Sequence, residues 1–77
     1  MKWLIDLMIE KNISVEFKMG EYEVLIIVKR NGISAMKSYY PIYPEENTKK
    51  IVKALILQAE KIIKKKEKEI KNESRRS

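Results

Sequence analysis

The sequence predicts an α+β domain with the element order α-β-β-β-α, in which both helices cover one face of a three-stranded antiparallel sheet. Three observations predict this fold. The first stretch carries polar residues at every fourth position, which is typical of a helix. The middle of the chain combines an alternating stretch, a continuous apolar stretch and an Asn-Gly pair, which indicates strands and a hairpin. The C-terminal stretch has apolar residues three and four positions apart and then becomes strongly basic.

Residues 2–11 are predicted to form the first helix. Lys2, Asp6 and Glu10 recur at intervals of four, and apolar side chains fill most of the other positions. This spacing gives the helix a narrow polar edge. Asn12 is expected to end it.

Three strands are predicted between the helices, at residues 13–19, 22–29 and 33–40. The first alternates apolar and polar residues, whereas the second is apolar at nearly every position and is expected to be the central strand. A two-residue turn at Asn31-Gly32 places Arg30 opposite Ile33 and Val24 opposite Tyr39. A similar turn at Met19-Gly20 would place Phe17 opposite Tyr22, Val15 opposite Val24 and Glu16 opposite Glu23.

These registers divide the side chains of the sheet between two faces. The core face is expected to carry Ile13, Val15, Phe17, Tyr22, Val24, Ile26, Val28, Ala35 and Tyr39. The reverse face is mostly polar, but four large side chains cluster there: Leu25, Ile27, Met36 and Tyr40. A patch of this kind, surrounded by charges, is typical of an interaction surface. The alternative is that the tail or a loop around Ile42 folds over it.

The second helix is predicted to begin after Pro41 and Pro44, either with Pro44 as its first residue or with Asn47 as its N-cap. Its docking face is expected to carry Val52, Ile56, Ala59 and Ile63. Residues 1–63 then form a single domain. Residues 64–77 form a basic helical extension, supported by Glu60–Lys64 and Glu67–Lys71 pairs, and a tail that we expect to be disordered from residue 72.

Composition excludes several kinds of chemistry. The chain has 77 residues and contains neither Cys nor His, so thiol chemistry and imidazole acid–base catalysis are absent. With two glycines it has no phosphate-binding glycine loop. We therefore predict a protein that is not an enzyme and that needs no cofactor or metal. The longest apolar run, residues 24–28, is far below the roughly 20 residues of a membrane span, and no signal peptide is evident, so a cytoplasmic location is expected.

The order of elements and one motif resemble the double-stranded RNA-binding domain. Thr48-Lys49-Lys50-Ile51-Val52-Lys53 is similar to the basic signature that opens the second helix of that family. The resemblance implies that Lys49, Lys50 and Lys53 contact the phosphates of a groove without reading sequence. That family also places a Gly-Pro and a His between its first two strands, where this chain has Met19-Gly20.

Charge favours a nucleic-acid partner. Residues 64–77 contain seven Lys or Arg against three Glu and so carry +4 of the formal net charge of +6. The residues of this stretch that are predicted to neutralise phosphates are Lys64, Lys65, Lys68, Lys71, Arg75 and Arg76. Our first hypothesis is a small accessory protein that binds RNA or DNA through these residues and the Lys-Lys-x-x-Lys motif. An acidic protein surface is a further partner for the same charges.

The rival hypothesis is a protein-interaction module, either a homodimer or an inhibitor of a larger complex. It uses the open sheet face through Leu25, Ile27, Met36 and Tyr40. The abundance of Lys and Ile suggests an AT-rich genome, such as that of a virus, a mobile element or a thermophile.

Overall fold

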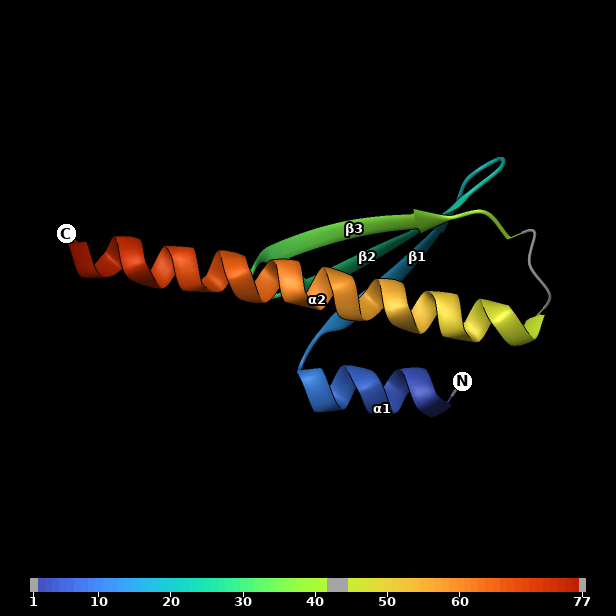
Figure 1. Cartoon of the computed structure of the whole chain (residues 1–77), viewed down its shortest axis with the longest axis horizontal. Coiled ribbons are helices and arrows are strands. Elements are labelled where there is room, and N and C mark those ends of the chain that lie inside the picture. The colour runs from blue at the N-terminus through green and yellow to red at the C-terminus, as the bar shows by residue number, and fades with distance from the viewer. Residues whose placement is uncertain (1, 42–44, 77) are drawn as a thin grey trace.

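The fold was obtained as a computed structural model, which describes residues 2–41 and 45–76, with the backbone alone described at 45–47 and 72–76. Helix α1 (Lys2–Lys11) is followed by strands β1 (Ser14–Met19), β2 (Val24–Arg30) and β3 (Ile33–Tyr39) and by helix α2 (Glu45–Arg76). The strands form one antiparallel sheet in the order β1-β2-β3. Both helices lie against one face of this sheet, so the predicted α+β fold is confirmed (Figure 1).

Helix α1 ends at Lys11, as its pattern predicted, because Asn12 adopts a left-handed conformation with φ of 53°. The amide of Ile13 donates a hydrogen bond to the carbonyl of Met8 (3.0 Å), and the amide of Asn12 donates to that of Ile9 (3.3 Å). These two bonds form a Schellman motif, which satisfies carbonyls that the helix leaves unpaired. Asn tolerates this conformation better than most residues, so Asn12 both ends the helix and directs the chain into β1.

The β2–β3 hairpin has the register that the Asn31-Gly32 turn predicted. Val24 pairs with Tyr39, Val28 with Ala35 and Arg30 with Ile33. Asn31 and Gly32 have φ values of 53° and 79°, as a type I′ turn requires at both central positions.

The β1–β2 register differs from our prediction. Phe17 pairs with Ile26, four positions further along than the expected partner Tyr22, and Glu16 faces Ile27 instead of Glu23. The connection is a four-residue loop, residues 20–23, closed by a hydrogen bond of 2.7 Å from the amide of Gly20 to the carbonyl of Glu23. A Cβ at Gly20 would lie 2.9 Å from that carbonyl oxygen, so the approach requires glycine.

The division of the sheet into two faces is nevertheless as predicted, because a shift by an even number of residues preserves it. Val24, Ile26 and Val28 are buried beneath the helices, whereas Leu25 and Ile27 point to the reverse face and are half-buried. Tyr22 is the exception to the predicted core. It lies in the loop between β1 and β2 and is 77% exposed.

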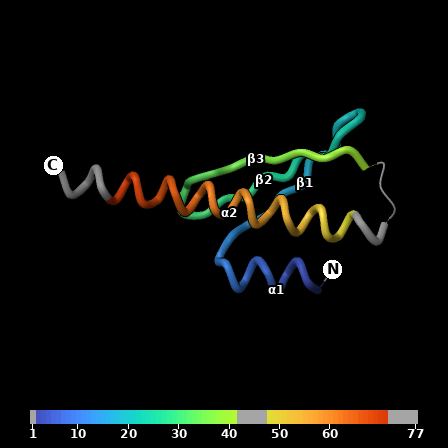
Figure 2. The backbone as a smooth tube through the Cα atoms, viewed as in Figure 1, coloured from blue at the N-terminus to red at the C-terminus, as the bar shows by residue number. Residues whose placement is uncertain are grey.

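Helix α2 packs through the predicted stripe, since Val52, Ile56, Ala59 and Ile63 are all buried. The helix begins at Glu45, so Asn47 lies within it and the prediction of Asn47 as N-cap was wrong; Pro44 lies outside the described residues. It reaches Arg76 and therefore includes most of the stretch for which we expected disorder. This single long rod gives the molecule its extents of 50 × 26 × 15 Å (Figure 2).

Candidate nucleic-acid interface

A buried ion pair joins the β2–β3 hairpin to helix α2. Arg30, the last residue of β2, donates from Nη1 to Oε1 of Glu60 at 3.2 Å. The two side chains are only 12% and 6% exposed, so each charge depends on the other for its compensation. The same Nη1 donates to the carbonyl of Lys11 at 2.8 Å, which ties the end of α1 to the same point.

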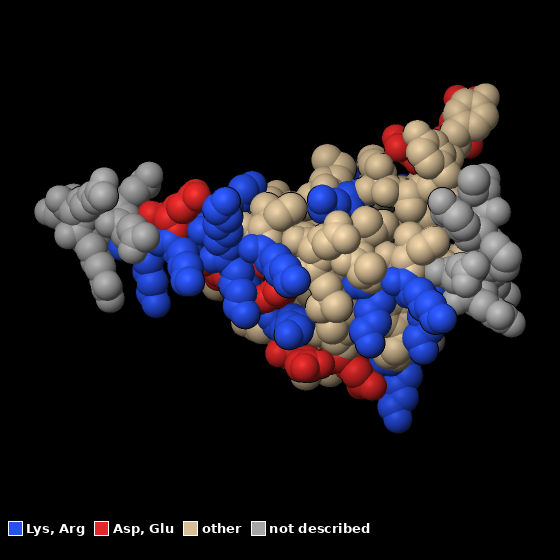
Figure 3. Space-filling view, viewed as in Figure 1, with Lys and Arg blue, Asp and Glu red and all other residues tan. Residues whose placement is uncertain are grey.

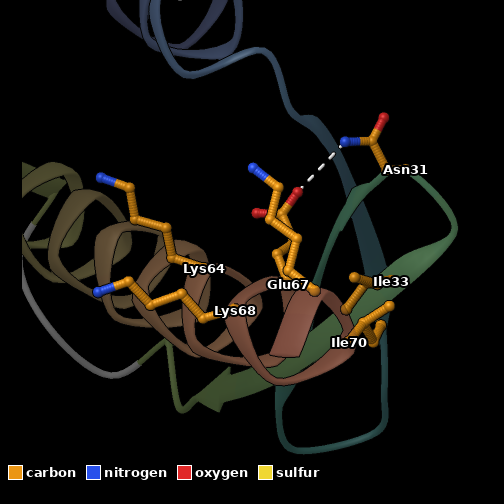
Figure 4. Close-up of a pocket in the computed structure, with 7 residues that line it drawn as sticks. Asn31, Ile33, Lys64, Glu67, Lys68 and Ile70 are labelled. Carbon is orange, nitrogen blue, oxygen red and sulfur yellow. Dashed lines mark hydrogen bonds between the residues drawn. The ribbon is translucent and has the colours of Figure 1, made fainter. Parts of the chain in front are cut away.

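Glu67, two turns further along α2, completes this cluster. Its Oε1 accepts from Nη2 of Arg30 at 2.7 Å and from Nε at 3.2 Å, and its Oε2 accepts from Nδ2 of Asn31 at 3.2 Å. Figure 4 shows Glu67 turned toward Asn31 at the tip of the hairpin. The predicted i, i+4 pairing of Glu60 and Glu67 with lysines is thus replaced by pairing with Arg30.

The electrostatic consequences follow from these contacts. The hydrogen bonds from Arg30 hold the pKa of Glu67 below its usual value, and the bond from Asn31 adds to this effect. The reciprocal bonds, that from Glu67 foremost, raise the pKa of Arg30. Both groups therefore stay charged at neutral pH, and the two carboxylates share one cationic partner, Arg30, on the inner side of α2.

The outer side of α2 carries lysines at spacings of three and four residues. We call this row the lysine ladder; its members are Lys50, Lys53, Lys61, Lys64, Lys68 and Lys71. Leu57 occupies the one position of the row that carries no charge. All six lysines are exposed. At 1.5 Å per residue the ladder is about 32 Å long. Figure 3 shows these basic side chains gathered over α2 in two groups, with uncharged residues between them.

Carboxylates are scarce on the same helix surface. Among the α2 side chains that the structure describes, nine lysines are exposed, whereas Glu69 is the one exposed carboxylate. Glu67 is one of the three Glu of the basic stretch, but its side chain turns inward to Arg30. The ladder is therefore more uniformly positive than the sequence suggested.

The lysines in the second half of the ladder, residues 61–71, are more closely spaced than those in the first half. Lys61, Lys64, Lys65 and Lys68 line a shallow hollow of about 400 Å³. Pairs of like charges four residues apart on a helix repel one another. A bound polyanion would relieve this repulsion, whereas an uncharged partner would not. A neighbouring groove, shown in Figure 4, runs between this part of α2 and the hairpin; there Ile70 lies beside Ile33, while Lys64 and Lys68 point away from Asn31.

The predicted phosphate contacts divide into three groups. Lys50, Lys53, Lys64, Lys68 and Lys71 belong to the ladder, and Lys65 lies beside it. Lys49 is exposed but turns toward α1, where its Nζ lies 5.9 Å from the ring centroid of Trp3. Arg75 and Arg76 lie outside the residues whose side chains are described.

Two residues of this site were missed. Lys61 belongs to the ladder, and its spacing from Lys64 and Lys68 would have revealed it. Arg30 is the second missed residue. It belongs to the site because its ion pairs turn two carboxylates, Glu60 and Glu67, away from the outer side of α2. The position of Glu60 between Ile56 and Ile63 on the docking side was a signal that it needs a cationic partner.

The rival surface on the reverse face of the sheet is also present. Met36 and Tyr40 are 58% and 57% exposed, and Leu25 and Ile27 are half-buried beside them. Glu16 and Lys18 are exposed on β1 next to this patch. Of the two predicted surfaces, the ladder is charged, whereas the patch formed by Leu25, Ile27, Met36 and Tyr40 is apolar within a mostly polar face.

Other kinds of site find no support in the described part of the chain. Its carboxylates form no group of three or more that could hold a metal ion. Neither described helix combines the length and the apolar character that a membrane span requires.

No protein-family model, curated protein or solved structure gives a significant match to the chain. The resemblance to the double-stranded RNA-binding domain thus rests on the order of elements and on residues 48–53, and membership of that family stays a prediction.

Proposed function

We propose that this protein is a small non-enzymatic accessory protein that binds nucleic acid through the lysine ladder of α2. The observation that carries the proposal is the sorting of charge on this helix. Glu60 and Glu67 both pair with Arg30 on the inner side, and lysines occupy the outer side. A row of positive charge about 32 Å long matches an extended polyanion better than a compact acidic ligand.

Binding of this kind reads the phosphate backbone and not the base sequence. The ladder consists of lysines, which act as point charges on flexible stems, and it offers none of the bidentate Arg or Asn contacts that distinguish bases. The affinity should therefore depend strongly on the salt concentration and only weakly on the base sequence of the nucleic acid. RNA and DNA share this chemistry, so the ladder alone supports either.

The test is a titration of labelled duplex with wild-type protein and with the double variant Lys64→Gln/Lys68→Gln at several salt concentrations. We expect wild-type affinity to fall steeply as salt rises. The variant loses two phosphate contacts, so its plot of log K against log salt concentration should be less steep than that of the wild type, by about 1.8 in the slope. The matched control is Lys2→Gln/Lys29→Gln, which removes the same charge from exposed positions outside α2 and outside the Glu16–Lys18 contact proposed below. Equal effects of the two variants, or no binding at low salt, would contradict the proposal.

A second candidate function is self-association through the reverse face. The observation that favours it is the exposure of Met36 and Tyr40 beside Leu25 and Ile27, with both helices on the opposite face. A second copy fits this patch because Glu16 of one chain can meet Lys18 of the other across a twofold axis. The two functions are compatible, since they use opposite sides of the molecule.

A further inference from the structure

Three aromatic side chains from three different elements line one pocket. The start of α1 and the end of β3, which supply two of them, lie toward the same end of the molecule (Figure 1). Trp3 comes from α1, Phe17 from β1 and Tyr39 from β3, and each is half-buried. The other lining residues are Met19, Val24, Thr48, Lys49 and Val52. The pocket holds about 500 Å³, which is ample for one planar ring system.

The walls and the rim of this pocket differ in chemistry. Its base is apolar, since Val24 and Val52 are buried, and none of its lining residues among those whose side chains the structure describes is a carboxylate. Its rim is cationic. Lys49 lies over the Trp3 ring, and Lys50 and Lys53, the first two members of the lysine ladder, are exposed within the next turn of α2. A ligand that fits this arrangement has a flat, apolar body joined to a negative charge.

We propose that the pocket binds an unpaired nucleobase of a polynucleotide whose phosphates lie along the lysine ladder. This inference rests on the proposed function and narrows its substrate to nucleic acid with an unpaired nucleotide, such as a duplex with a single-stranded overhang. A base in a continuous duplex is stacked on both sides and cannot enter a recessed pocket. An unpaired base can stack on any of the three rings, whatever its identity.

The position of the pocket relative to the ladder supports this assignment. The N-terminal part of α2 supplies Thr48 and Lys49 to the pocket, and the ladder starts at the next residue, Lys50. A strand that leaves a duplex bound on α2 therefore reaches the pocket beside Lys50 and Lys53, the members of the ladder next to it. An acyl chain would fill the apolar walls but would carry one charge only, and it would leave the rest of the ladder without a partner.

The chain contains one tryptophan, and it lines the pocket, so Trp3 emission reports on stacking. The experiment compares a blunt duplex with the same duplex carrying a short thymidylate overhang. Affinity is followed by anisotropy of a dye on the far end of the duplex, and stacking by quenching of Trp3. We expect the duplex with the overhang to bind about tenfold more tightly than the blunt duplex, because one base–aromatic stack contributes about that factor in affinity. We also expect it to quench the emission of Trp3.

Two variants make the test specific. Tyr39→Leu removes one ring of the pocket but keeps an apolar side chain against the core, so it should lose the preference for the overhang and retain the affinity for the blunt duplex. Tyr22→Leu is the matched control, because Tyr22 is 77% exposed in the β1–β2 loop and does not line the pocket. Thermal unfolding of both variants checks that the fold is kept.

The outcomes separate this inference from the proposed function. Equal affinity for both duplexes with unchanged Trp3 emission would overturn the base pocket and leave the proposed function standing. Quenching by dodecanoate but not by the overhang would assign the pocket to acyl chains and overturn the inference as well. Absence of binding to either duplex at low salt would overturn both.

Discussion

Arg30 is the residue on which the largest number of elements depends. It ends β2, donates to Glu60 and Glu67 of α2, and donates to the last carbonyl of α1. A single guanidinium can do this because it presents five donors in a fixed plane, which a lysine cannot. The charge pattern of the outer surface follows from this one residue, since it removes two carboxylates from the ladder's surroundings.

Replacement of Arg30 by Met should destabilise the protein strongly. Glu60, whose side chain is 6% exposed, would lose its cationic partner, and breaking a pair of this kind costs on the order of 3 kcal/mol. Urea unfolding followed by circular dichroism measures the change. The double variant Arg30→Met/Glu60→Leu should recover most of the lost free energy of unfolding, because neither charge is then buried. A double variant as unstable as the single one would show that the ion pair is not the cause.

At the scale of elements, the contacts between α2 and the hairpin continue beyond the core stripe. The docking stripe that we predicted ends at Ile63, yet Glu67 still bonds to both Arg30 and Asn31. The basic half of the helix is therefore anchored to the sheet and does not begin as a free rod. This anchor holds Lys64 and Lys68 at fixed positions relative to the domain.

The anchor predicts an acid-sensitive contribution to stability. The pKa of Glu67 is lowered in the folded protein, so its ion pair stabilises the fold at neutral pH. This contribution is present above the unfolded-state pKa of about 4.3 and is lost as the pH falls through the lower folded-state pKa. Arg30 keeps its charge throughout. We expect the free energy of unfolding to fall more steeply on acidification in the wild type than in Glu67→Gln.

Denaturant titrations between about pH 6 and about pH 3 measure this difference. Glu69→Gln is the control, because Glu69 is an exposed carboxylate of the same helix. It should follow the wild-type pH dependence. Parallel curves for wild type and Glu67→Gln would contradict the prediction.

The elements also show which parts of the fold the sequence can predict. The β2–β3 register followed from Asn31-Gly32, because that pair restricts the turn to one type. The segment from Met19 to Glu23 places no such restriction, and the choice between a two-residue turn and a four-residue loop depends on packing elsewhere. The lysines were visible in the sequence. Their separation from Glu60 and Glu67 was not, because it depends on a partner thirty residues away in sequence from Glu60.

At the scale of the whole molecule, the sheet separates two surfaces of opposite character. Both helices lie on one side of the sheet (Figure 1), and basic side chains gather over α2 (Figure 3). The apolar patch of the reverse face lies on the other side of the sheet. A dimer formed through the reverse faces would place its two ladders on opposite outer sides. Two phosphate-binding surfaces on one particle would raise its avidity for long nucleic acid without any new contact.

This arrangement predicts that the protein is a dimer and that Leu25→Glu makes it a monomer. Leu25 is half-buried at the centre of the patch, between Lys18 and Ser38, so a carboxylate there would be desolvated in a dimer but hydrated in a monomer. Light scattering coupled to size exclusion measures the mass. Ile5→Glu is the matched control, because Ile5 is 58% exposed on α1, away from the patch, and should leave the dimer intact. A wild-type mass near the 9.2 kDa of one chain would refute self-association. Unchanged thermal unfolding of Leu25→Glu would show that the substitution acts on assembly and not on the fold.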